Sequence, residues 1–282
     1  MIIGNQSFAP GHTYIMGILN VTPDSFSDGG RYNTFDKALI RVEEMISEGA
    51  DVIDIGGEST RPGYQHITAE EEIERTAPVI EAVTQRFDIP VSIDTYKPAV
   101  AEHAVKSGAA LINDIWGLKG EDLKVPESGM AEVIKKYGVA CCIMHNRVLN
   151  GTADPVAAPD HIAGVIIKEL QESLDIAYKA GIDKDRILLD PGVGFGKTYE
   201  DNINTIRYLE KICDAFDLPM LLGTSRKSVI GLTLDLDKDN RLEGTLATTA
   251  RAIDAGCMFV RVHDIKENAR FIKMYEAIRK SS

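Results

Sequence analysis

Short apolar runs recur along the chain, and each of them is bounded by turn-forming residues. Most are nearly continuously apolar, which is typical of strands buried on both faces of a parallel sheet. One example is YIMGILN (14–20), which stops at Asn20 and is followed by a polar, Gly-rich segment. The predicted strands cover residues 14–20, 51–57, 90–95, 110–115, 139–145, 187–192, 219–225 and 258–264.

Between these runs the apolar residues follow the 3.6-residue spacing of amphipathic helices. In TFDKALIRVEEMISEG (34–49) they form one stripe, and Gly49 ends the segment as a C-cap. Thr68 and Glu71 have the spacing of a capping box at the start of the next helix. The predicted helices cover residues 34–49, 69–86, 97–107, 129–137, 160–180, 199–215, 241–255 and 266–280.

Strand and helix alternate eight times, with no linker or low-complexity tract between them. This pattern predicts an α/β fold, a single (β/α)8 TIM barrel over residues 1–282 with a short N-terminal extension or hairpin. A doubly wound open sheet is the alternative, because the order of strands along a sequence does not show whether the sheet closes.

Polar residues stand at the carboxyl end of every predicted strand. A barrel gathers these ends into one ring, where barrel enzymes place their chemistry. One such residue alone would be an ordinary turn residue, since Asp, Asn and Gly favour turns. Eight polar ends together, several of them still inside apolar runs, favour a functional site. In chain order the residues are Asn20, Gly57, Glu58, Asp94, Asn113, Asp114, His145, Asp190, Ser225, Arg261 and His263.

Acidic and amide side chains on this ring indicate a ligand that is rich in N–H donors. Asp94 and Asp190 follow apolar neighbours, so each carboxylate needs a partner, either an ion pair or a ligand. Together with Asn113 they suit a fused aminopyrimidine ring, since a fixed carboxylate accepts two parallel hydrogen bonds from such a ring.

Four cations are predicted around the same opening, although the chain carries a net charge of −12. They are Arg61, Lys227, Arg261 and His263. Solvated surface charge is the alternative; it suits Arg226 but not Arg261, which alternates with apolar residues inside its strand. The clustering favours an anionic substrate, while the acidic balance argues against a nucleic-acid partner.

The segment DPGVGFGKT (190–198) resembles two phosphate-binding motifs but matches neither of them. A P-loop needs Gly where Pro191 stands, and a dinucleotide fingerprint needs Gly where Lys197 stands. Its glycines suit a loop that passes close to a flat ligand, with Phe195 available to stack on it.

Cysteine spacing and hydropathy bear on the compartment. The four cysteines lack the spacing of zinc ligands, and no apolar run approaches the roughly 18–20 residues of a membrane span. We therefore expect reduced thiols, no membrane partner and a cytoplasmic protein.

Seven motifs, in order from the first strand to the eighth, resemble those of the dihydropteroate synthase family. They are NVTPDSFSDGG (20–30), GGESTRPG (56–63), SIDTYK (92–97), NDI (113–115), DPGVGFGKT (190–198), GTSRKS (223–228) and RVHD (261–264). The resemblance implies an enzyme that joins p-aminobenzoate to 6-hydroxymethyl-7,8-dihydropterin diphosphate, releasing diphosphate and 7,8-dihydropteroate, with Mg²⁺ as cofactor. It also implies small-molecule substrates and a homodimer. The apolar residues of the last two predicted helices either supply the interface or pack on the barrel: Ala252, Ile253, Phe271, Ile272 and Ile278.

The resemblance also assigns roles to residues of this sequence. The pterin ring would contact Asp94, Asn113, Ile115, Met144, Asp190, Gly223 and Lys227. The diphosphate would contact Asn20, Thr60, Arg261 and His263, and Asn20 would also bind Mg²⁺. The p-aminobenzoate pocket would use Thr60, Arg61, Pro62, Phe195 and Ser228. Catalytic roles would fall to Asp94, Lys227, Arg261, His263 and Phe26.

The implied mechanism is dissociative. Diphosphate leaves first, and the arylamine then attacks the pterin methylene cation, so no nucleophilic side chain is needed. Catalysis would rest on positioning and on stabilisation of the leaving group. We expect the loop after Asn20 to close and carry Phe26 over the site, excluding water from the cation.

Two alternatives stay open. A pterin-binding methyltransferase that acts on methyltetrahydrofolate and a corrinoid protein would share the barrel, but it would not need TSRKS, STRPG or NVTPDSF. A non-catalytic pterin-binding relative would not need to keep the motif residues, which are all present here. Residues 117–128 and 145–160 inherit no role from the resemblance.

Overall fold

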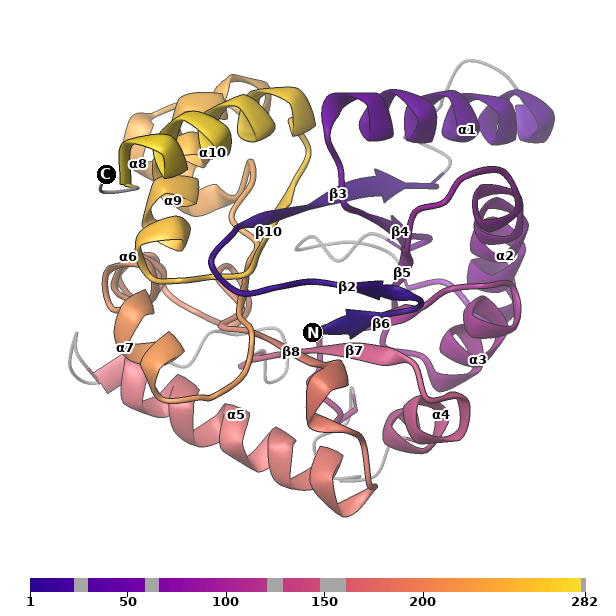
Figure 1. The fold of residues 1–282 in the computed structure, drawn as a ribbon, viewed down its shortest axis with the longest axis horizontal. Coiled ribbons are helices and arrows are strands. Elements are labelled where there is room, and N and C mark those ends of the chain that lie inside the picture. The colour runs from indigo at the N-terminus through magenta and orange to yellow at the C-terminus, as the bar shows by residue number, and fades with distance from the viewer. Residues whose placement is uncertain (23–29, 59–65, 121–128, 148–160, 280–282) are drawn as a thin grey trace.

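The computed structural model describes residues 1–22, 30–58, 66–120, 129–147 and 161–279, without the side chains of residues 30–34. Within these ranges the chain forms an eight-stranded parallel sheet ringed by helices (Figure 1). The strands are β3 (Tyr14–Asn20), β4 (Val52–Gly56), β5 (Val91–Asp94), β6 (Leu111–Asp114), β7 (Ala140–Met144), β8 (Ile187–Asp190), β9 (Leu221–Leu222) and β10 (Phe259–Val262).

The sheet closes into a barrel. Strands β3 to β8 are neighbours in chain order, β9 pairs with β10, and β10 pairs with β3. A parallel bridge between Leu189 and Met220 joins β8 to the residue before β9, and the Leu189 N–H donates to Pro219 O at 3.0 Å. The predicted (β/α)8 barrel is therefore confirmed, and the open doubly wound sheet is wrong.

Helices cover the outside of the barrel (Figure 1). The prediction of one helix over 199–215 is wrong, because Tyr208, with φ −98° and ψ 20°, separates two helices. The helices are α1 (Gly30–Glu48), α2 (Ala69–Arg86), α3 (Pro98–Lys106), α4 (Met130–Tyr137), α5 (His161–Lys179), α6 (Tyr199–Arg207), α7 (Leu209–Asp214), α8 (Ser228–Leu234), α9 (Leu242–Asp254) and α10 (Ile265–Arg279). Among the described residues, none of these helices is both long and apolar enough to cross a bilayer.

Local signals explain several helix ends. Gly49, the predicted C-cap of α1, has a positive φ of 106°. Thr68 caps α2 by accepting from the Glu71 N–H at 3.2 Å, but the Glu71 carboxylate pairs with Arg75. The capping box predicted there is therefore half formed, whereas a complete one opens α6.

Each strand alternates between two hydrophobic clusters, because successive side chains point to opposite faces of a strand. Outward residues such as Ile53 and Ile55 belong to the larger cluster, beneath the helices. Inward residues near the amino ends, such as Met16, Leu111 and Phe259, form a second cluster inside the barrel.

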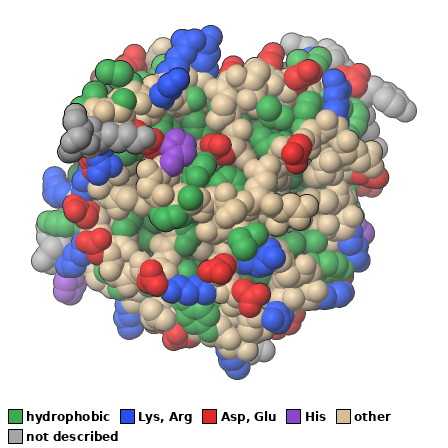
Figure 2. All heavy atoms as spheres, in the orientation of Figure 1, with side chains coloured by type: hydrophobic (Ala, Val, Ile, Leu, Met, Phe, Trp, Pro, Cys, Tyr) green, Lys and Arg blue, Asp and Glu red, His purple; other side chains and the backbone are tan. Residues whose placement is uncertain are grey.

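The chain begins with the predicted hairpin, in which β1 (Ile2–Ile3) pairs antiparallel with β2 (Gln6–Ser7). Figure 1 shows it lying across the middle of the ring of strands. Ile3 and Phe8 are buried in the inner cluster, and the Phe8 ring centroid lies 5.1 Å from that of Phe259. The hairpin therefore closes the amino end of the barrel. On this face acidic and basic side chains are intermixed (Figure 2).

Candidate functional site

The inward-facing side chains change from apolar to polar toward the carboxyl end of the barrel. Val52 and Phe259 belong to the inner apolar cluster, and two residues further along the same strands stand Asp54 and Arg261. Because side chains repeat their direction every two residues, these polar groups point into the same interior. The alternation of the strands thus assembles a polar layer above an apolar one.

Strand register places several predicted residues in one row across the barrel. Asn20 is level with Gly56, Gly56 with Asp94, and Asp94 with Asn113. A Cβ added at Gly56 would lie 3.7 Å from Asn20 Oδ1 and 3.8 Å from Asp94 Oδ2. The amide of Asn20 and the carboxylate of Asp94 therefore face the same small gap.

Arg261 holds two carboxylates in the middle of this ring. Its Nε donates to Asp54 Oδ2 at 2.6 Å, and its Nη2 donates to Asp94 Oδ2 at 2.5 Å. Asp54 Oδ2 also accepts from Asn113 Nδ2 at 3.2 Å. Within the part of the chain that is described, Asp94 Oδ1 is buried without a hydrogen-bond partner. Buried polar atoms are rarely left unpaired, so this oxygen is suited to accept from a ligand.

The charges of this pair are set by burial and by their proximity. Burial raises the pKa of Asp94 to about 7, with Arg261 opposing the rise and Asp54 adding to it. Burial would lower the pKa of Arg261, but Asp54 and Asp94 outweigh it and raise that pKa above its ordinary value. Arg261 therefore stays charged, and burial makes Asp94 easier to protonate than an exposed aspartate.

Asp190 and Lys227 form a second group of charges at the opening. Asp190 Oδ1 accepts from the Gly192 N–H at 2.7 Å, and burial raises the pKa of this carboxyl against the charge of Lys227. Burial also lowers the pKa of Lys227 to about 8, with Asp190 opposing the shift. A Cβ added at Gly223 would lie 3.6 Å from Asp190 Oδ2 and 3.8 Å from Arg261 Cβ, so the two groups adjoin at this glycine.

A loop after β8 presents its backbone and one aromatic ring to Lys227. The Nζ of Lys227 donates to Val193 O at 2.5 Å and lies 4.7 Å from the centroid of the Phe195 ring. A cation above a ring face is attracted by the ring quadrupole. Lys227 therefore links the loop after β8 to the segment that precedes α8.

An apolar cluster adjoins these charges. Ile115 and Met144 are buried against Tyr96, and Trp116 and Phe195 pack against them. Met144 is level with Asp190 in the sheet, which places the cluster at the carboxyl end of the strands. Acceptors next to flat apolar walls suit a planar heterocycle that carries N–H groups.

His263 differs from its prediction in one respect. Its Nδ1 lies 3.1 Å from Ser225 Oγ, and burial, followed by the charge of Arg261, lowers the pKa of His263 to about 3. The imidazole is therefore neutral near pH 7, and the expectation of a fourth positive charge from His263 is wrong. It offers a hydrogen bond instead.

Comparison with known proteins shows which family has this sequence. The family model described as pterin binding enzyme matches residues 16–263. Dihydropteroate synthase of Clostridium beijerinckii is 53% identical over 281 residues, 99% of each chain. This chain belongs to the dihydropteroate synthase family.

Two solved structures support the same assignment. Dihydropteroate synthase of Clostridium difficile, in the presence of pteroic acid, has a TM-score of 0.88 at 47% identity and covers 98% of this chain and 100% of its own. The enzyme of Xanthomonas albilineans with 4-aminobenzoic acid has a TM-score of 0.88 at 37% identity, covering 96% of this chain and 95% of its own. The predictions of fold class, transferase class and dihydropteroate synthase function are confirmed.

The structure gathers most of the residues that the dihydropteroate synthase motifs point to. Ser228 is exposed at the start of α8, directly after Lys227. Phe26, Thr60, Arg61 and Pro62 lie outside the described residues. The individual roles assigned to site residues stay predictions. The residues that meet at the carboxyl end are Asn20, Asp94, Asn113, Ile115, Met144, Asp190, Phe195, Gly223, Lys227, Arg261 and His263.

Two members of the predicted ring hold the structure around the site. Glu58 is buried in an ion pair with Lys97, whose Nζ also donates to Glu72 Oε2 at 2.8 Å. Asp114 accepts from the N–H groups of Trp116 and Leu118 at 2.9 and 2.8 Å. For these two acids the interpretation as structural strand-end residues is correct.

Arg226, expected to be a solvated surface charge, is mostly covered. Its Nη2 and Nε donate to the two oxygens of Asp264 at 2.5 and 3.1 Å, and its φ is 58°. The ion pair with Asp264 holds the GTSRKS turn in this uncommon backbone conformation. The expectation for Arg226 is therefore wrong.

Asp54, which holds Arg261 in this member of the dihydropteroate synthase family, was not predicted as a site residue. The signal was available, because Asp54 lies in the run DVIDIGG with the same two-residue phase as Gly56. Lys197 was considered only as a departure from a nucleotide-binding motif, and nothing in its spacing indicates that its side chain is buried.

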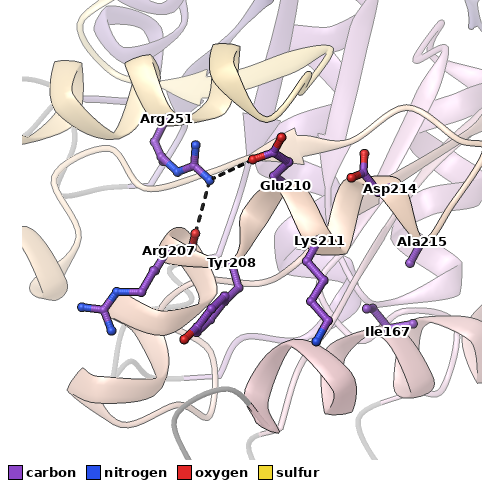
Figure 3. A pocket seen from close by; sticks show the side chains of 8 residues that line it. All are labelled: Ile167, Arg207, Tyr208, Glu210, Lys211, Asp214, Ala215 and Arg251. Atoms are coloured by element: carbon purple, nitrogen blue, oxygen red, sulfur yellow. Dashed lines mark hydrogen bonds and ion pairs between the residues drawn. The ribbon is translucent and has the colours of Figure 1, made fainter.

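A separate hollow of about 550 Å³ lies on the outer surface between helices (Figure 3). Arg251 there lies 3.2 Å from Arg207 O and 3.8 Å from Glu210 Oε2. Lys211 and Asp214 also line it. None of the predicted site residues does, so this hollow is distinct from the candidate active site.

Proposed function

We propose that this chain condenses p-aminobenzoate with 6-hydroxymethyl-7,8-dihydropterin diphosphate to give 7,8-dihydropteroate and diphosphate. One observation supports this above all. Asp94, paired with Arg261, and Asp190, beside Lys227, come from distant parts of the sequence and face one opening. Their chemistry suits a ring with N–H donors that carries an anionic leaving group.

The pterin ring lies between the acceptors and the apolar cluster. Asp94, with its free Oδ1, and Asp190 accept N–H groups of the ring. Ile115 and Met144 contact the ring plane. The ammonium of Lys227 is beside Asp190. From there it donates to the acceptor atoms of the ring. Fixed charges that need no rearrangement lower the cost of reaching the transition state.

The reaction breaks one C–O bond and forms one C–N bond. The bond between the methylene carbon and the diphosphate oxygen breaks first, and both electrons leave with the diphosphate. Arg261 and the neutral His263 donate hydrogen bonds to the departing oxygens. The amine nitrogen of p-aminobenzoate then attacks the methylene cation and loses a proton. Phe195 borders the aryl ring of p-aminobenzoate, because it packs beside Ile115 and Met144, which contact the pterin ring.

A Mg²⁺ ion fits the chemistry of this rim. Magnesium favours oxygen ligands and commonly bridges substrate phosphates while it keeps several waters. The amide oxygen of Asn20, beside the gap left by Gly56, is an oxygen of this kind. When bound, the ion neutralises charge that develops on the diphosphate. The described residues contain no group of three or more His, Cys, Asp or Glu side chains that could hold a metal ion. The substrate and water would therefore supply most of the ligands of the ion.

The decisive experiment is a condensation assay. Purified protein is incubated with the pterin diphosphate, labelled p-aminobenzoate and Mg²⁺, and labelled dihydropteroate is measured. Asp94→Asn should lower kcat/KM by about 100-fold, because it removes a charge-assisted acceptor. Asp88→Asn, on an exposed aspartate, serves as the matched control. Absence of product from the wild-type protein would contradict the proposal.

The same assay separates the alternatives. A methyltransferase would form no dihydropteroate and would instead transfer a methyl group from methyltetrahydrofolate to a corrinoid protein. A non-catalytic relative would bind the pterin diphosphate without turnover. Inhibition by a sulfonamide, which resembles p-aminobenzoate, would support the synthase over both.

The proposed enzyme is a homodimer. Met274 and Ile278 of α10 are 62% and 68% exposed, so this helix offers apolar surface for a second copy. Phe271 and Tyr275 stack on the same helix with ring centroids 5.5 Å apart. Ala252, Ile253 and Ile272 are buried in the monomer and therefore pack on the barrel. Light scattering coupled to size exclusion measures the oligomeric state, and a monomer at micromolar concentration would contradict this assignment.

A further inference from the structure

A buried lysine that the proposed mechanism does not use stands in the loop after β8. Lys197 is 8% exposed, and its Nζ donates to Gly192 O at 2.7 Å, Phe195 O at 3.2 Å and His145 O at 3.4 Å. A lysine ammonium has three donors, so these three carbonyls match its full capacity. Burial lowers the pKa of Lys197 to about 7 and Asp190 opposes the shift, while the three carbonyl acceptors favour the ammonium form.

The backbone around this ammonium has little freedom to rearrange. A Cβ added at Gly192 would lie 1.8 Å from His145 O, and the φ of Gly192 is +66°. The Gly194 N–H donates to Asn202 Oδ1 at 2.6 Å, which ties the loop to α6. The ammonium of Lys197 thus lies inside a loop that closes around it, between the ends of β7 and β8.

The same loop supplies two contacts to the candidate site. Its Val193 O accepts from Lys227, and its Phe195 ring lies under the Lys227 ammonium and beside Ile115 and Met144. Lys197 bonds to Phe195 O directly. The hydrogen bond to the Phe195 carbonyl therefore connects the buried lysine to the position of the Phe195 ring.

We propose that Lys197 is a positioning residue that holds Phe195 in place for p-aminobenzoate by folding the loop 191–196 around its ammonium. The identity of that substrate rests on the proposed function. Lys197 does not act as a proton donor or acceptor in the reaction, because its three donors are directed at backbone carbonyls rather than into the opening.

The test compares Lys197→Met with Lys184→Met. Lys184 is an exposed lysine that pairs with Asp217 at 2.5 Å in a turn before β8, and it serves as the control. K197M should raise the KM for p-aminobenzoate at least about tenfold, the equivalent of one lost aromatic contact. Its affinity for the pterin diphosphate should stay within about threefold of wild type, because Arg261 holds Asp94 and Asp54 holds Arg261, all three outside the loop.

Trp116 gives a readout that does not depend on turnover. It is the sole tryptophan of the chain and packs in the same cluster as Phe195. K197M should therefore change its emission, whereas K184M should not. This readout separates the two proposals: without dihydropteroate formation the proposed function fails, while an altered Trp116 emission in K197M still supports the loop role.

A double-mutant cycle tests whether Lys197 acts through Phe195. The effect of K197M on the KM for p-aminobenzoate should disappear in a Phe195→Ala background, because the positioned ring is gone. If K197M does not fold, Lys197→Arg replaces it; the planar guanidinium keeps the charge but does not direct three donors as an ammonium does. Wild-type KM and emission, additive effects in the cycle, or equal losses for both substrates with a lowered Tm would each overturn the proposal.

Discussion

Asp54 holds two other residues of the site in place. It is fully buried and accepts from both Arg261 Nε and Asn113 Nδ2. Arg261 in turn binds Asp94, so the Asp54 carboxylate sets the direction of two groups that are proposed to contact the substrate. Breaking a buried ion pair leaves the remaining charge without compensation in a poorly solvating interior.

Asp54→Asn tests this dependence. We expect the free energy of unfolding to fall by about 3 kcal/mol, because Arg261 would be left with one carboxylate in a buried site. We also expect kcat/KM to fall by about 100-fold as Asp94 and Arg261 lose their relative orientation. Urea unfolding and the condensation assay measure the two effects.

Asp217→Asn is the matched control for this substitution. Asp217 is 97% exposed and pairs with Lys184 on the surface, so its loss should leave the free energy of unfolding nearly unchanged. Equal losses of stability in the two variants would show that Arg261 does not depend on Asp54.

Site residues could be predicted from the sequence where a charged residue interrupts a run of apolar residues. Asp94, Asp190 and Arg261 interrupt apolar runs, and the structure places all three at the opening. Asp54 interrupts such a run as well, yet its partner is 207 positions away in sequence, and only the closed sheet brings the two together. The neutral state of His263 was equally hidden, because burial is a property of the fold.

At the scale of elements, period-two alternation determines most of the site. Asn20, Asp94 and Asn113 occupy the last inward positions of β3, β5 and β6, and the parallel register makes them level through Gly56 of β4. The strands were predictable because each is a nearly continuous apolar run bounded by turn-forming residues. The division of the helix at 199–215 was not, because Tyr208 follows NTIR without Gly or Pro to mark a break.

The predicted role of the loop after β3 is tested by a substitution of Phe26, which lies outside the described residues. Phe26→Ala should lower kcat by at least about tenfold, because water would reach the methylene cation. Affinity for the pterin diphosphate should stay unchanged, since Asp94 and Asp190 belong to β5 and β8. Quenching of Trp116 fluorescence measures the affinity, and Phe26→Tyr, which keeps the ring, is the control. Unchanged turnover in F26A would rule out the role of Phe26.

For the whole molecule, buried charge is concentrated at the carboxyl end of the barrel and shapes stability against pH. Burial raises the pKa of Asp94 to about 7 and that of Asp114 to about 6, which favours the folded state as pH falls through those values. Burial lowers the pKa of His145 and His263 to about 3, which has the opposite sign. The two pairs partly cancel between about pH 4 and 6.

His145→Gln separates one of these contributions from the rest. His145 is buried with Nε2 3.0 Å from Glu169 Oε2, and between pH 6.5 and about 3 its unfolded state binds a proton that the folded state does not. The unfolded state is therefore favoured as pH falls through that window. Removing the imidazole should remove this term, so the stability of H145Q relative to wild type should rise by on the order of 1 kcal/mol per pH unit between pH 6 and 4. Urea unfolding at several pH values measures the difference, with His103→Gln, on an exposed histidine of α3, as the control. A constant difference between H145Q and wild type across this range would show that His145 is not held neutral by the fold.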